Sequence, residues 1–144
     1  MTVARYRGLL CLYVALTTAA TAASFFPDYS EPLARAYDEE PHTWLMNWVF
    51  ADPWLSIGLL GGLFLVCLAG LVGLFFFKRW ARMISLYSTL VVLPLAPFCG
   101  PQLFWGLESA LFEASSIVWG AVLAVSYFSK VSERFDSGGL LKAA

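Results

Sequence analysis

Few residues in this sequence have the types and spacing that catalysis or cofactor binding requires. The cysteines Cys11, Cys67 and Cys99 fall in three different apolar stretches and form no Cys-x-x-Cys pair, so no thiol–disulfide centre is predicted. The single histidine, His42, cannot supply bis-histidine haem ligation or a zinc triad. Neither a glycine-rich phosphate loop nor a nucleophile elbow occurs. We therefore expect a protein that is not an enzyme and that binds no cofactor or metal.

Two carboxylates, Glu108 and Glu113, lie near one end of an apolar stretch. Ionisable groups within a membrane span are costly and usually functional. On a helix, Glu113 shares a face with Ser116, Ile117 and Gly120. We expect Glu113 to point into a helix bundle or toward a partner, and the alternative is an ordinary acidic residue at headgroup level.

The composition is that of a membrane protein. Of the 144 residues, 60% are hydrophobic and 13% are charged, against about 25% charged in soluble domains. A soluble fold of this length would leave large apolar patches exposed to water, whereas lipid can cover them. The net charge of −1 and the absence of a basic footprint exclude a nucleic-acid partner.

Charge-free runs predict an all-α integral membrane protein with a single domain, a bundle of four transmembrane helices. The expected spans are residues 8–26, 54–77, 83–98 and 108–130. Three connecting segments are expected: an acidic periplasmic loop (27–53), a cytoplasmic turn (78–82) and an outer turn (99–107). A cytoplasmic tail (131–144) follows the last span.

Basic residues orient the predicted bundle. Four spans place both termini on one side, and eight of the nine lysines and arginines fall on that side. This bias predicts cytoplasmic termini and a bacterial-type inner membrane. Lys78, Arg79 and Arg82 would then face the cytosol and anionic headgroups, mainly as determinants of topology.

The first span also resembles a cleaved secretory signal. It has a basic start, an apolar stretch and an Ala-x-Ala motif at Ala20 to Ala22. Cleavage would leave three spans and place the new amino terminus outside. We retain four spans.

The outer loop predicts a short amphipathic helix at the membrane interface. Trp44, Leu45, Trp48 and Val49 share one helical face of its "HTWLMNWVF" segment. Trp44 and Trp48 are therefore candidate contacts on the outer side, together with Glu113. This loop has two alternative roles, a structural lid over the bundle or a dedicated recognition surface. We interpret the run "DEEPH" as solvated charge rather than as a cation site.

Small residues recur at helical spacing within the spans. Gly58, Gly62 and Gly70 lie on one row of the second span, and Gly120 lies with Ser116 and Ala124 on the fourth. Such rows let helix backbones approach closely in lipid. Contacts inside the bundle explain most of them, and a surplus face is available for another subunit.

These features predict an accessory or assembly subunit of a larger membrane complex. Its partners would be membrane lipids and other membrane-protein subunits, as a hetero- or homo-oligomer. Two alternatives are a homo-oligomeric pore or small-solute transporter that uses Glu113, and an immunity-type protein that neutralises a membrane-active toxin.

Overall fold

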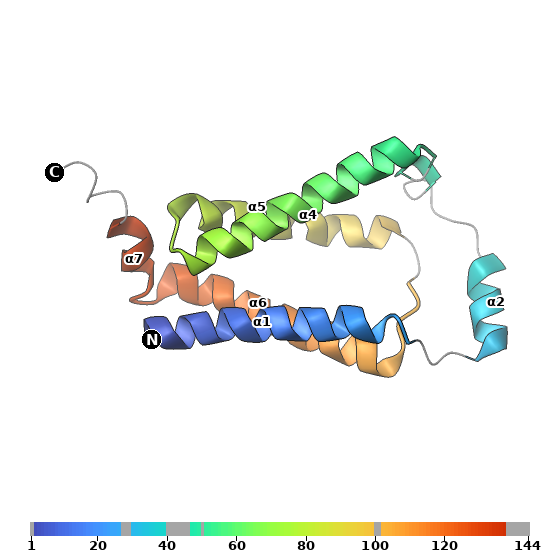
Figure 1. The fold of residues 1–144 in the computed structure, drawn as a ribbon, viewed down its shortest axis with the longest axis horizontal. Helices are drawn as coiled ribbons and strands as arrows, with labels where there is room; N and C mark the ends of the chain where they lie inside the picture. The colour runs from blue at the N-terminus through green and yellow to red at the C-terminus, as the bar shows by residue number, and fades with distance from the viewer. Residues whose placement is uncertain (1, 27–29, 40–46, 50, 100–101, 138–144) are drawn as a thin grey trace.

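The computed structural model describes residues 2–26, 30–39, 47–49, 51–99 and 102–137. Within these ranges the chain is helical and contains no strand, which confirms the all-α prediction. The elements are α1 (Val3–Ala23), α2 (Glu31–Glu39), α4 (Pro53–Phe75), α5 (Arg79–Leu95), η1 (Ala96–Cys99), α6 (Gly106–Phe128) and α7 (Ser132–Ser137) (Figure 1).

Two of the described helices, α4 and α6, are long and apolar enough to cross a membrane. Each has 23 residues, and a hydrocarbon core of about 30 Å requires roughly 20. Most of their side chains are not covered by the rest of the protein. By length and composition, these two helices indicate association with a membrane.

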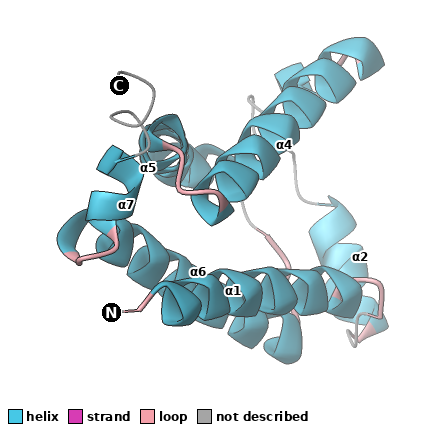
Figure 2. Cartoon of the chain, turned by 60° about the vertical axis from the view of Figure 1, so that its left-hand side comes forward, coloured by secondary structure: helices cyan, strands magenta, loops and turns pink. Residues whose placement is uncertain are grey.

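The long helices form two antiparallel pairs. Helix α1 packs along α6, and α4 packs along α5 (Figure 1). The pairs meet at the end that carries the start of α1 and the helix α7, and α4 diverges from α1 and α6 toward the opposite end (Figure 2). The fully buried core therefore lies at the end where the pairs meet.

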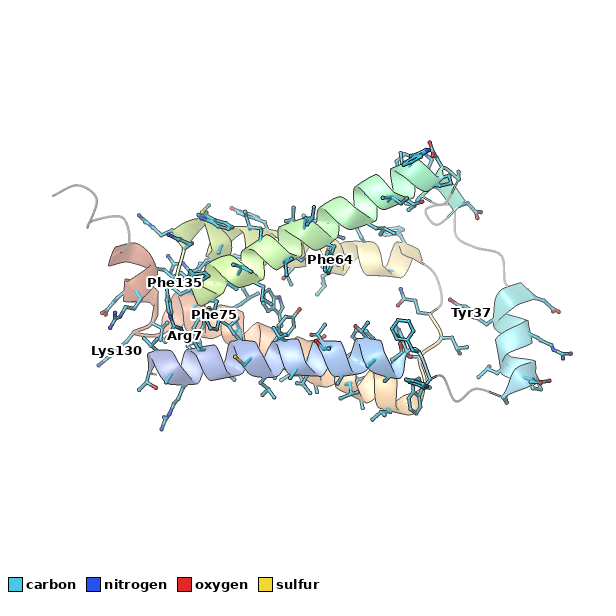
Figure 3. All side chains as sticks on the ribbon, in the orientation of Figure 1. Arg7, Tyr37, Phe64, Phe75, Lys130 and Phe135 are labelled. Atoms are coloured by element: carbon cyan, nitrogen blue, oxygen red, sulfur yellow. The ribbon has the colours of Figure 1, made fainter. Side chains whose placement is uncertain are left out.

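An aromatic cluster at that end holds α1, α4, α5, α6 and α7 together. The ring of Phe77 lies 5.6 Å from that of Tyr6 and 5.2 Å from that of Phe135. The Arg7 guanidinium covers the rings of Phe75 and Phe77, at 5.0 and 5.5 Å (Figure 3). Fully or almost fully buried neighbours complete the core: Leu10, Leu74, Ala81, Val122 and Val131.

A second contact joins α1, α5 and α6 near their middles. The Trp119 ring packs against Tyr13, with centroids 4.7 Å apart. Its indole N–H donates to the Thr89 hydroxyl over 2.9 Å, and that hydroxyl donates to the Ser85 carbonyl over 2.8 Å. The Thr89 hydroxyl of the third predicted span thus forms its hydrogen bonds inside the protein.

The turn between α4 and α5 is a Schellman motif. The Lys78 N–H donates to the Gly73 carbonyl over 2.8 Å, and the Phe77 N–H donates to the Leu74 carbonyl over 3.2 Å. Phe77 has a left-handed φ of 56°, a conformation that glycine normally supplies at this position. Because α5 already begins at Arg79, this turn is shorter than the expected segment 78–82, and both Arg79 and Arg82 are helical.

The two helices approach closely at two glycines just before this turn. A Cβ on Gly70 would lie 2.8 Å from the Ser85 hydroxyl oxygen, and one on Gly73 would lie 2.5 Å from the Ala81 Cβ. Both glycines are buried. Their missing side chains therefore set the distance between α4 and α5.

The segment between α1 and α4, which was expected to be an outer loop, contains a helix that was not predicted. Helix α2 has Glu31 and Arg35 paired at 3.4 Å on its exposed side, and it runs across the direction of the long helices (Figure 1). The expected interfacial helix falls partly on residues 40–46, which lie outside the described residues. Its described part, 47–49, is helical, with Trp48 exposed and Val49 buried.

Candidate functional site

Helix α6 has two opposite faces of different character. The buried face consists of Glu108, Ser115, Val122, Leu123 and Ser126. Because 3.6 residues make one turn, the opposite side carries a second row, which we call the Glu113 face. Its members are Ser109, Glu113, Ser116, Ile117, Gly120 and Ala124, and all of them are exposed except the half-buried Ser109.

An open groove lies on the Glu113 face near the start of α6. It has a volume of about 570 Å³ and is lined by Phe104, Ser109, Phe112, Glu113, Ser116 and Ile117. The rings of Phe104 and Phe112 meet edge to face, with centroids 5.7 Å apart. The Ser116 hydroxyl donates to the Phe112 carbonyl over 2.9 Å. Glu113 thus contributes one carboxylate to a largely apolar groove.

Within the described part of the chain, Glu113 forms no ion pair. The basic residues gather at the opposite end of the protein, where Figure 3 labels Arg7 and Lys130. Arg35 lies elsewhere, on α2, where it pairs with Glu31. Among the described residues, therefore, no cation pairs with Glu113.

The second candidate acid, Glu108, occupies a different environment. It lies in the first turn of α6 and is 5% exposed. A carboxylate at this position is stabilised by the positive end of the helix dipole. Beside it, the Trp105 indole N–H donates to the Ala23 carbonyl at the end of α1 over 3.1 Å. Of the two candidate acids, Glu108 is therefore covered by the rest of the chain, whereas Glu113 is exposed.

The structure divides the predicted glycine positions into two groups. Gly70 packs against α5 inside the chain. Gly58, Gly62 and Gly120 have no side chain or neighbouring helix within 4 Å of the position where a Cβ would stand. These three glycines therefore lie on surfaces that are open for close approach by another helix.

Gly73 makes the tightest of these contacts, although the predicted interface residues do not include it. Its Cβ position would also lie 3.0 Å from the Trp80 ring. The available signal was its spacing, because Gly73 follows Gly70 by three residues and so lies on the adjacent helical row.

Of the three basic residues predicted at the turn, Arg82 has a packing role. Its guanidinium lies 4.9 Å from the Phe135 ring and 5.3 Å from the Tyr127 ring, and it donates to the Ser126 carbonyl over 3.2 Å. Lys78 and Arg79 remain candidates for headgroup contact. On the outer side Trp48 is exposed, and Trp44 lies outside the described residues.

The described residues contain no group of three or more histidine, cysteine, aspartate or glutamate side chains that could hold a metal ion. Comparison of the chain with protein-family models, with curated proteins and with solved structures finds no match. The candidate site is thus defined by its own geometry, which is an exposed helix face and an open groove with a single carboxylate.

Proposed function

We propose that the protein is a multi-pass inner-membrane protein in which α1, α4, α5 and α6 form a four-helix bundle. Both termini lie in the cytoplasm, because eight of the nine basic residues fall on one side of the bundle. The protein is not an enzyme. It acts as an accessory or assembly subunit of a larger membrane complex and binds its partner through helix-to-helix contacts.

The observation that carries this proposal is the pair of open glycines on the first half of α4. Large apolar side chains there are exposed on several sides, among them Trp54, Ile57 and Phe64. Lipid is sufficient to cover such side chains, so they do not by themselves indicate a partner. Gly58 and Gly62, however, have no neighbour from the described residues within 4 Å of their Cβ positions. In lipid no hydrophobic force drives helices together, so helix pairs depend on close packing, and glycines at this spacing allow it.

The substitution Gly62→Leu tests the proposal. Leucine adds volume where the partner backbone would lie. We therefore expect the variant to insert into the membrane but to lose its partner. Gly61→Leu is the matched control, because the Cβ position of Gly61 also has nothing within 4 Å among the described residues but lies about 100° away around the helix. The measurement is purification from native membranes in a mild detergent, followed by native mass spectrometry.

Wild-type protein and the control should retain the partner at a fixed stoichiometry, and Gly62→Leu should lose it. Retention by Gly62→Leu would contradict a partner contact at this face. An equal loss from both variants would show that the effect is not specific to it.

A further inference from the structure

Glu113 places a negative charge within the apolar length of α6. It is the eighth residue of a helix that begins at Gly106, which puts it about 10 Å along the helix axis. An ionised carboxylate at such a depth in a bilayer is costly unless a cation pairs with it. Glu113 is nevertheless exposed, and no described residue of the chain pairs with it.

We propose that the Glu113 face binds a membrane helix of a different subunit, and that a lysine or arginine of that helix pairs with Glu113 in the groove. This inference rests on the proposed function and names the chemistry of the partner. A cation on an otherwise apolar helix also has a desolvation cost, so the two groups compensate each other when they pair.

The shape of the face fits a helix. Ser109, Ser116, Gly120 and Ala124 are small and follow one another along the exposed side of α6. A Cβ on Gly120 would meet nothing within 4 Å. Small residues in this arrangement let two helix backbones approach closely and bring a side chain of the second helix within reach of Glu113.

The groove also fits the stem of a basic side chain. Lysine and arginine carry three or four methylene groups, which pack along apolar surface while the charged end seeks a polar partner. Phe104 and Phe112 line the groove beside Glu113, and aromatic faces attract cations in addition. The groove therefore offers apolar walls for the stem and a carboxylate for the charge.

The cation cannot come from a second copy of this chain. In a parallel arrangement, the spans of the second copy carry no lysine or arginine at the depth of Glu113. Arg35 lies in α2, outside the spans, and is paired with Glu31. Two copies that met through this face would also bring two carboxylates together, which is repulsive. The occupant is therefore a helix of another protein.

Charge substitutions at Glu113 test the pairing. The wild-type protein, Glu113→Gln, Glu113→Lys and the control Glu133→Gln are purified from native membranes and weighed by native mass spectrometry. Glu133 is an exposed acid on α7, at the opposite end of the protein. We expect Glu113→Gln to lower partner occupancy at least tenfold and Glu113→Lys to abolish it, with Glu133→Gln unchanged. Thermal melting in detergent checks that each variant is folded.

Several outcomes would overturn the pairing. The first is unchanged partner occupancy in Glu113→Gln. The second is that this variant loses a bound amine-headgroup lipid but no protein. The third is a complex that contains only copies of this chain. Loss of the partner in Gly62→Leu but not in Glu113→Gln would reject this inference and leave the proposed function standing. A wild-type protein that purifies without any partner would reject both.

Discussion

The contact between Gly73 and Ala81 allows a quantitative test of how α4 and α5 pack. An alanine at position 73 would place its Cβ 2.5 Å from the Ala81 Cβ and 3.0 Å from the nearest Trp80 ring atom. Carbon atoms prefer about 3.5–4.0 Å, so the helices must separate by about 1 Å. The Trp80 ring is exposed and can move, but Ala81 is fully buried and its Cβ is fixed to the backbone of α5.

The expected cost follows from two opposing effects. Overpacking a well-packed contact costs about 1–3 kcal/mol, and replacing glycine by alanine in a helix returns about 1 kcal/mol. We therefore expect Gly73→Ala to lower the free energy of unfolding by up to about 2 kcal/mol. The shift also disturbs the turn, because the Gly73 carbonyl accepts the Lys78 N–H.

Detergent-titrated unfolding in mixed micelles, followed by tryptophan fluorescence, measures this change. Gly62→Ala is the control, since nothing lies within 4 Å of its Cβ position, and its stability should stay equal or rise. Ala81→Gly in the Gly73→Ala background should recover the loss by removing the clashing atom. The reasoning is refuted if Gly73→Ala is as stable as Gly62→Ala, or if the two positions show no coupling in the double-mutant cycle.

Two further predictions use the same unfolding assay. The Tyr6 hydroxyl is buried and has no hydrogen-bond partner among the described residues, so Tyr6→Phe should leave stability unchanged or raise it by about 1–2 kcal/mol, and a clear decrease would contradict this. Trp119→Phe removes the 2.9 Å hydrogen bond to Thr89 and should cost about 1 kcal/mol. Adding Thr89→Val should then cost much less than it does in the wild type, and full additivity would argue against this hydrogen bond.

The positions of α4 and α6 follow closely from local sequence. The charge-free runs predict spans at 54–77 and 108–130, and the helices occupy Pro53–Phe75 and Gly106–Phe128. Local composition is sufficient here because a helix satisfies the backbone hydrogen bonds of a long apolar run within the run itself. A local signal also starts α4, since the Asp52 side chain caps this helix by accepting the Trp54 N–H over 2.9 Å.

Helices α1 and α5 begin earlier than the sequence analysis expects. The expected spans exclude Arg5, Arg7, Arg79 and Arg82 because charge is costly in lipid, yet all four are helical. The side chains of Arg7 and Arg82 lie over aromatic rings supplied by distant parts of the chain, which a local count of charge does not reveal. Helix α2 was missed because its charged residues suggested a loop, although Glu31 and Arg35 have the spacing of a helical ion pair.

The sequence by itself determined the helical class, the apolar character of the long helices and the asymmetric distribution of basic residues, because each depends on composition and short-range spacing. It also placed Glu113, Ser116 and Gly120 on one face. Only the tertiary structure decided that this face is open while Glu108 is buried, and that Gly70 packs internally while Gly58 and Gly62 do not. Helical periodicity defines the faces of a helix, but contacts between residues far apart in the chain select the face that each neighbour covers.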